Sequence, residues 1–274
     1  MYELNGKAAV KVRDKELRET LNMVFMYVLI TYSLTWLFWY GEFKGFTGLR
    51  IVGSFVPSVV GIIFRLKDRN MDKRMFSTKF PPIVIVFVLS YSFLSLAIPN
   101  VLARLLGYGT GRFVIHEYVG GIPVYNVFSF FVVFLLVLVA GGPLGEEIGW
   151  RGYLMQRLEK SFNPVTAAVL TGICWACWHI PMLVFNVDGY DISFFDYLLQ
   201  TIILSVITGW VFIRCGRNII AAILFHTIDN LVLSLCFQPA LKTTNLYTVI
   251  YWLLQLAVGV FCACDLYLRD EKRS

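Results

Sequence analysis

Eight apolar stretches, each about 20 residues long and nearly free of charge, constrain the fold of this chain more than any other feature. They lie at 21–40, 47–64, 80–98, 124–144, 164–186, 196–213, 219–238 and 246–267. A helix of about 20 apolar residues crosses roughly 30 Å of hydrocarbon. Of all residues 58% are hydrophobic and only 15% are charged, unlike a soluble domain. We therefore predict an all-α membrane protein, a polytopic bundle of about eight transmembrane helices that forms one integral-membrane domain over 1–274.

Lysine and arginine are distributed unevenly between the two sides of this predicted bundle. Nineteen of the 24 lie in segments on the side of the N-terminus, and five lie on the other side. Because positive charge marks the cytoplasmic side, we expect both termini in the cytoplasm of a plasma-membrane protein. Anionic lipid head groups account for the net charge of +6, which therefore does not indicate a nucleic-acid partner.

Three short polar clusters lie within the apolar stretches or directly after one of them. In GEEIGWR, Glu147 and Arg151 stand four residues apart and can pair on one helix face, while Glu146 points about 100° away. In WACWH, His179 follows Trp175 by one helical turn near the middle of a predicted span. These two clusters therefore place ionisable groups directly at the end of one predicted span and inside another.

The third cluster, HTIDN, carries His226 and Asn230 on one helix face, with Asp229 on its edge. Buried His and Asn side chains often only join helices in membrane bundles. Ionisable groups are otherwise scarce in these spans, however, and an isolated one in hydrocarbon costs a few kcal/mol. We therefore expect the three clusters to converge around water, as in a hydrolytic site.

Glycines accompany the first cluster. Gly141, Gly145 and Gly149 repeat every four residues, which allows a neighbouring helix to approach closely. Gly142 and Pro143 interrupt the same stretch, so we predict a kink beside the two glutamates.

The segments EEIGWR, WACWH and HTIDN resemble the EExxxR, F/WxxxH and HxxxN motifs of the CPBP or ABI family of intramembrane glutamic endopeptidases, which includes the type II CAAX prenyl endopeptidases. The motifs occur in the expected order within a protease core at about 124–238. The resemblance implies an intramembrane endopeptidase that hydrolyses a peptide bond near the membrane, of the type that processes CAAX tails or a related one.

The resemblance also implies roles for individual residues. Glu146 and His179 would activate a water molecule, and His226 and Asn230 would form the oxyanion hole. The residues that would support this site are Glu147, Arg151 and Trp175. General chemistry agrees, because a positioned carboxylate can act as a general base and preorganised donors stabilise a developing oxyanion.

Three alternatives remain open. Glutamate and two histidines could bind zinc with an open fourth position, as in a zinc-dependent protease of the same fold. The chain lacks HExxH, and Asn230 is a poor zinc ligand, so we favour a mechanism without metal or other cofactor. A non-catalytic binding or immunity protein could hold a partner in the same cavity, and a transporter could relay protons, although its polar residues would extend through both leaflets.

The expected partners are the lipid bilayer and a membrane-associated peptide or protein substrate, prenylated or not; no oligomeric state is indicated. We expect a water-filled active-site cavity that faces the cytoplasm. If their spans begin at 219 and 164, His226 lies about 10 Å and His179 about 22 Å from the cytoplasmic surface at 1.5 Å per residue. These unequal depths conflict with a shared site unless the helices begin at different levels.

Overall fold

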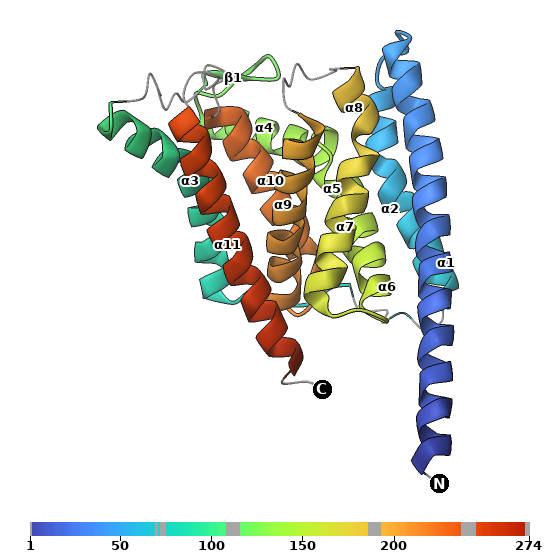
Figure 1. Cartoon of the computed structure of the whole chain (residues 1–274). Coiled ribbons are helices and arrows are strands. Elements are labelled where there is room, and N and C mark those ends of the chain that lie inside the picture. The colour runs from blue at the N-terminus through green and yellow to red at the C-terminus, as the bar shows by residue number, and fades with distance from the viewer. Residues whose placement is uncertain are drawn as a thin grey trace.

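The computed structural model describes residues 2–68, 71, 75–107, 116–185, 193–236 and 245–271, which are almost entirely helical (Figure 1). The helices are α1 (Tyr2–Phe43), α2 (Leu49–Lys67), α3 (Pro82–Leu105), α4 (Val127–Ala140), α5 (Pro143–Gly149), η1 (Trp150–Met155), α6 (Gln156–Leu158), α7 (Pro164–Trp178), α8 (Ile180–Val184), α9 (Phe194–Arg214), α10 (Ile219–Cys236) and α11 (Asn245–Glu271). Strands β1 (Tyr118–Val119) and β2 (Ile122–Pro123) pair antiparallel. The prediction of an all-α polytopic membrane protein is confirmed.

Helix length and apolarity identify the candidate spans. Within the described ranges, six helices can cross a membrane, namely α1 from Val12 onward, α2, α3, α9, α10 and α11. A seventh span results if α4 and the helical segment Pro143–Leu158 are taken together. Helix α7 is apolar but has only 15 residues, and α8 follows it after His179. The number of eight spans therefore stays a prediction.

The chain bends where the sequence predicts a kink. Helix α4 ends at Ala140, and the segment that begins at Pro143 is inclined to it by 41°. Gly142 has a φ of 101°, a left-handed conformation that glycine adopts without strain. Pro143 then occupies the first turn of α5, where its missing N–H is not needed. The predicted kink is thereby confirmed.

Helix α1 begins and α11 ends at the same end of the bundle, which we call the terminal end (Figure 1). Arg157 of α6 and Asp68 after α2 form an ion pair of 3.0 Å there. At the opposite end, which we call the far end, Phe43 of α1 and Phe185 after α8 stack with ring centroids 4.4 Å apart. Helices α7 and α10 run from the terminal end to the far end, and α2 and α9 run in the opposite direction (Figure 1).

The π-helix η1 lies in the centre of the bundle, where it contacts α2, α7, α9 and α10. Most of its side chains are fully buried, including those of Trp150, Arg151, Tyr153, Leu154 and Met155. Single π-helical turns inside α-helices are rare and are frequent at functional sites. The two glutamates of the first motif lie four and three residues before this turn begins.

Two glycines allow α5 to pack closely on α2. A Cβ atom on Gly145 would lie 2.5 Å from the carbonyl oxygen of Ser54, and one on Gly149 would lie 2.4 Å from that of Pro57. The predicted close approach of a neighbouring helix is thus confirmed for these two glycines. Gly141 instead ends α4, and a Cβ atom there would meet the carbonyl of Val137 in its own helix.

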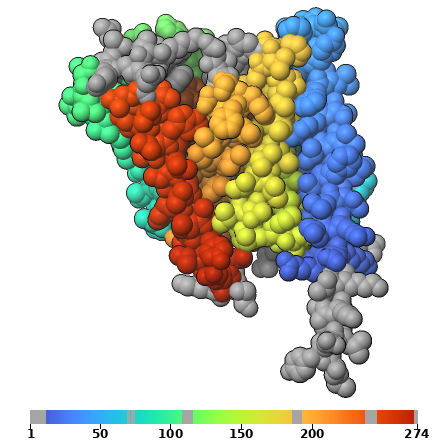
Figure 2. Space-filling view, viewed as in Figure 1, coloured from blue at the N-terminus to red at the C-terminus, as the bar shows by residue number. Residues whose placement is uncertain are grey.

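The outer surface is apolar. Figure 2 shows α1, α7, α9 and α11 side by side on one face of the molecule. Many large apolar side chains of α11 are exposed on the outside of the bundle, among them Val249, Leu253, Leu256, Val260 and Phe261. Such a belt is the surface that lipid chains cover in an integral membrane protein.

Candidate functional site

Glu146 lies in the first turn of α5 and is almost completely buried, with 4% of its surface exposed. Its carboxylate oxygen Oε2 accepts a hydrogen bond of 2.6 Å from the indole Nε1 of Trp175 in α7. A Cβ atom on Gly142 would lie 2.0 Å from the other oxygen, Oε1. The glycine therefore leaves space for the carboxylate, and the tryptophan fixes its orientation.

Glu147 points to a different set of partners. Its Oε1 accepts a hydrogen bond of 2.8 Å from Nη1 of Arg151 and lies 2.9 Å from Nδ1 of His226 in α10. Glu147 and Arg151 are fully buried, and the guanidinium carbon lies 4.6 Å from the ring centroid of Trp175. The expected pairing of Glu147 with Arg151, with Glu146 facing elsewhere, is what the structure shows.

The hydrogen bonds of the two histidines determine which ring nitrogen is available to a ligand. Nδ1 of His179 lies 3.0 Å from the carbonyl oxygen of Trp175. Carbonyl and carboxylate oxygens only accept, so Nδ1 carries the hydrogen in His179 and also in His226, which faces Glu147. In each histidine Nε2 is therefore the nitrogen left for water or substrate.

Asn230 lies one turn after His226 on α10 and is half-buried. Its Nδ2 makes a long hydrogen bond of 3.4 Å to the carbonyl of Gly141, at the break between α4 and α5. His226 and Asn230 thus both face the segment that carries the glutamates. His226 contacts Glu147, and Asn230 contacts the carbonyl of Gly141.

Trp175 connects the three motifs. Its indole ring meets the ring of His226 edge to face at 5.1 Å and lies 6.2 Å from the ring of His179, measured between centroids. Together with its bond to Glu146, these contacts gather the predicted residues from α5, α7 and α10 around one side chain. The sequence identified Trp175 only as a supporting aromatic residue, and its role as a hydrogen-bond donor to the acid is new.

Two further features near the site were not identified from the sequence. Gly142 was read only as part of a kink, although its lack of a side chain is what accommodates Glu146. His179 packs edge to face on Trp178 at 4.6 Å and on Tyr197 of α9 at 5.4 Å. The role of Gly142 could have been suspected, because this glycine directly precedes PLGEE. No pattern in the sequence indicates the contact between His179 and Tyr197.

A metal centre is the main chemical alternative for such a set of residues. Among the described residues, no three His, Cys, Asp or Glu side chains are grouped closely enough to hold a metal ion. Glu147 is already engaged by Arg151 and His226, and Glu146 by Trp175. The choice between a glutamic and a metal-dependent mechanism remains a prediction.

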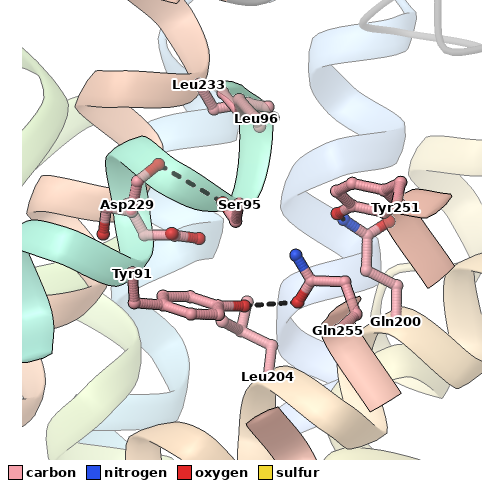
Figure 3. Close-up of a pocket in the computed structure, with 10 residues that line it drawn as sticks. Tyr91, Ser95, Leu96, Gln200, Leu204, Asp229, Leu233, Tyr251 and Gln255 are labelled. Atoms are coloured by element: carbon pink, nitrogen blue, oxygen red, sulfur yellow. Dashed lines mark hydrogen bonds between the residues drawn. The ribbon is translucent and has the colours of Figure 1, made fainter. Parts of the chain in front are cut away.

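A small polar cavity lies on another side of α10 (Figure 3). Its volume of about 30 Å³ gives room for about two water molecules. Asp229 lines it, next to residues of α3, α9 and α11. Figure 3 shows the hydroxyl of Tyr91 donating to Gln255, and the amide of Gln200 donates to the hydroxyl of Tyr251 at 2.8 Å. Asp229, to which the motifs assign no role, therefore faces a different polar space from that of Glu146.

Comparison with known proteins agrees with the motifs. Residues 128–232 match the model of the family described as Rce1-like, type II CAAX prenyl endopeptidase. The chain is also 27% identical to CAAX prenyl protease 2 of Methanococcus maripaludis over 232 residues, which are 75% of this chain and 82% of that protein. All three motifs lie within the family match. The resemblance seen in the motifs is thereby confirmed, and both matches indicate an intramembrane protease.

Proposed function

From this confirmed resemblance to the Rce1-like type II CAAX prenyl endopeptidases, we propose that the chain hydrolyses a peptide bond of a membrane-associated substrate with water activated by Glu146. The observation that carries this proposal is the hydrogen bond between Trp175 and Oε2 of Glu146. It leaves Oε1 as the oxygen that can accept a proton from water. A carboxylate with one oxygen fixed and one available is suited to general-base catalysis.

His179 holds the same water molecule in this proposal. Because its Nδ1 hydrogen is committed to the carbonyl of Trp175, Nε2 is an acceptor in the neutral ring. Water positioned between Glu146 and His179 loses one proton to the carboxylate, and its oxygen forms a bond to the scissile carbonyl carbon. The proton then passes to the leaving amine as the carbon–nitrogen bond breaks, which restores the carboxylate.

The oxyanion formed in this step is met by His226 and Asn230. Nε2 of His226 donates a hydrogen bond only when the ring is an imidazolium, since Nδ1 already donates to Glu147. The adjacent carboxylate of Glu147 stabilises that cation, and Arg151 holds the carboxylate in place. Glu147 and Arg151 are thus positioning residues, which act through His226. Loss of one oxyanion donor typically lowers turnover by about 10²–10³.

The substrate is proposed to be a membrane-associated peptide or protein, with prenylation left to experiment. Membrane fractions from cells that produce the wild-type chain, Glu146→Gln or Glu117→Gln are compared by proteomics. Glu117 is an exposed glutamate in the segment before β1, so its substitution serves as the matched control. We expect one or more peptide fragments to disappear with Glu146→Gln and to persist with Glu117→Gln. Fragments that persist with Glu146→Gln at wild-type abundance would contradict the role of this residue.

A further inference from the structure

Asp229 is an intramembrane carboxylate that the proposed mechanism does not use. It is the eleventh of the 18 residues of α10, near the middle of a candidate membrane span. A charged side chain at such a depth is costly, and it normally has a partner of opposite charge or a functional role. The carboxylate therefore requires a partner that neutralises it.

No cationic side chain supplies this partner in the cavity of about 30 Å³ that Asp229 lines. The described residues around the cavity include no Lys, Arg or His, and Asp229 is their only acid. On the same helix, His226 precedes Asp229 by three residues, but its Nδ1 donates to Glu147. The two glutamates of the first motif already balance Arg151 and a cationic His226. One negative charge thus remains at Asp229.

Neutral side-chain oxygens from three further helices surround the same cavity. They belong to Tyr91, Ser92 and Ser95 of α3, Gln200 of α9, and Tyr251 and Gln255 of α11 (Figure 3). The hydroxyl of Ser92 neighbours the carboxylate of Asp229, and its buried Oγ makes no regular hydrogen bond to any described residue. A carboxylate with neutral oxygens, and without sulfur or imidazole ligands, is suited to a hard cation.

The hydrogen bonds inside the cavity use donors and leave oxygen lone pairs. Tyr91 donates its only hydroxyl hydrogen to the side-chain carbonyl of Gln255, so the Tyr91 oxygen can then only accept. Gln200 donates through its amide nitrogen to the hydroxyl of Tyr251, which leaves the carbonyl oxygen of Gln200 as an acceptor. These oxygens are therefore available to a cation.

We propose that the cavity binds one monovalent cation of the size of sodium or potassium. Charge selects the valence, because one carboxylate neutralises one positive charge and a divalent ion would leave a net charge inside the bundle. In agreement, the described residues contain no group of three His, Cys, Asp or Glu side chains that could hold a metal of higher charge. The volume has room for this ion and one water molecule, which can accept a hydrogen bond from Nε2 of Gln255.

The bound cation joins α10 to three neighbouring helices. Asp229 lies between His226 and Asn230 in the sequence of α10, so the helix that binds the ion also carries both residues proposed for the oxyanion hole. Helices α3 and α11 lie outside the residues 128–232 that match the family model. We therefore expect the ion to stabilise the fold and, resting on the proposed function, to increase turnover.

Thermal unfolding of the full chain in detergent tests the site without catalysis. Sodium or potassium chloride replaces choline chloride at constant ionic strength, so that screening of charges does not change. We expect the Tm to rise by about 3 °C at a cation concentration of about ten times the Kd, and the rise to saturate. Asp229→Asn should abolish the rise, whereas Asp14→Asn, which changes an exposed aspartate of α1, should retain it.

Three outcomes of this measurement would overturn the proposal. They are an unchanged Tm of the wild-type protein, an equal rise in Asp229→Asn, and a rise with calcium or magnesium but with neither monovalent ion.

Direct binding of radioactive sodium or rubidium ions to the wild-type chain covers the case in which Asp229→Asn does not fold. We expect one bound ion per chain, displaced by the unlabelled ion, and weaker binding when Ser92→Ala and Ser95→Ala are combined. The absence of saturable binding to the wild-type chain would overturn the site.

The rate of peptide cleavage separates this site from the proposed function. We expect replacement of the monovalent cation by choline to lower the kcat of the wild-type protein about 5-fold or more, and to leave the rate of Asp229→Asn unchanged. Cation binding without an effect on kcat would overturn the link to α10 and leave the site in place. Cation binding by a chain that cleaves no peptide would support the site and count against the protease function.

Discussion

The indole Nε1 of Trp175 donates a 2.6 Å hydrogen bond to Oε2 of Glu146, so the motif on α7 fixes the acid of the motif on α5. A second indole–carboxylate bond, from Trp210 of α9 to Asp265 of α11 at 2.9 Å, lies elsewhere in the bundle. The two bonds are chemically alike. Removing each bond in turn therefore separates the catalytic role of Trp175 from the loss of stability that follows when any such bond is removed.

Replacing Trp175 with Phe keeps an aromatic ring and removes the donor. A hydrogen bond to a charged group contributes about 1.5–3 kcal/mol, so we expect turnover to fall about 10- to 100-fold. The rate is measured with a reporter peptide under single-turnover conditions. Trp210→Phe should retain the wild-type rate, and equal losses in both variants would contradict a specific role for Trp175.

Replacing Gly142 with Ala should abolish activity. The added Cβ atom would lie 2.0 Å from Oε1 of Glu146, and the φ of 101° is strained for alanine. Gly45 has a similar φ of 97° but nothing within 4 Å of an added Cβ atom, so Gly45→Ala isolates the backbone strain. We expect both variants to lose about 1–2 kcal/mol of stability and only Gly142→Ala to lose activity. Normal activity in Gly142→Ala would show that the acid has another position available.

Replacing Arg151 with Met should destabilise the protein strongly. Glu147 would then be a buried carboxylate that has lost the guanidinium of Arg151 and keeps only His226, and breaking a buried ion pair in this way typically costs about 3–5 kcal/mol. The double substitution Glu147→Gln with Arg151→Met removes both charges and should recover part of this loss. Thermal unfolding in detergent compares the wild type with the two variants, and a double variant less stable than Arg151→Met would contradict the pairing.

Replacing Glu147 with Gln should lower turnover about 10- to 100-fold while the substrate KM changes little. The amide retains the shape of the side chain but no longer stabilises a cationic His226, which weakens the oxyanion donor. The measurement is the separation of kcat from KM on the reporter peptide. A rise in KM with unchanged kcat would assign Glu147 to substrate binding instead.

Treatment of the purified protein with a strong zinc chelator should leave its activity unchanged, as the metal-free mechanism requires. The measurement is the cleavage rate after chelation and after addition of zinc. A loss that zinc restores would assign Glu146, His179 and His226 to a metal site, and would leave the protease function intact.

Much of the fold could be predicted, because a chain that crosses hydrocarbon must satisfy its backbone hydrogen bonds internally, and an α-helix does so within one segment. The helical periodicity also separated the partners of Glu147 from those of Glu146, because residues four apart share a face and adjacent residues do not. Gly142 and Pro143 predicted the bend, because proline removes a backbone hydrogen bond inside a helix and sharp kinks are usually found at such residues.

The remaining features depend on tertiary contacts that local patterns do not encode. Periodicity gives the face of Trp175 but not the rotamer that brings its N–H to Glu146. The depth of His179 depended on where α7 begins relative to α10, and only the packing on Tyr197 fixes it. The π-helix also escaped prediction, because its altered hydrogen-bond spacing leaves no characteristic composition in WRGYLM.

The π-helix gives the segment between Glu147 and α6 one residue more than an ordinary α-helical turn would hold. Because the wide turn takes up this residue locally, removing one residue from 150–155 should produce an ordinary turn and leave the helix on either side in nearly the same orientation. Such a deletion can therefore keep both the contact of Glu147 with His226 and the ion pair of Arg157 with Asp68. A deletion from an ordinary α-helical turn would instead rotate one side against the other by about 100° and separate one of these pairs.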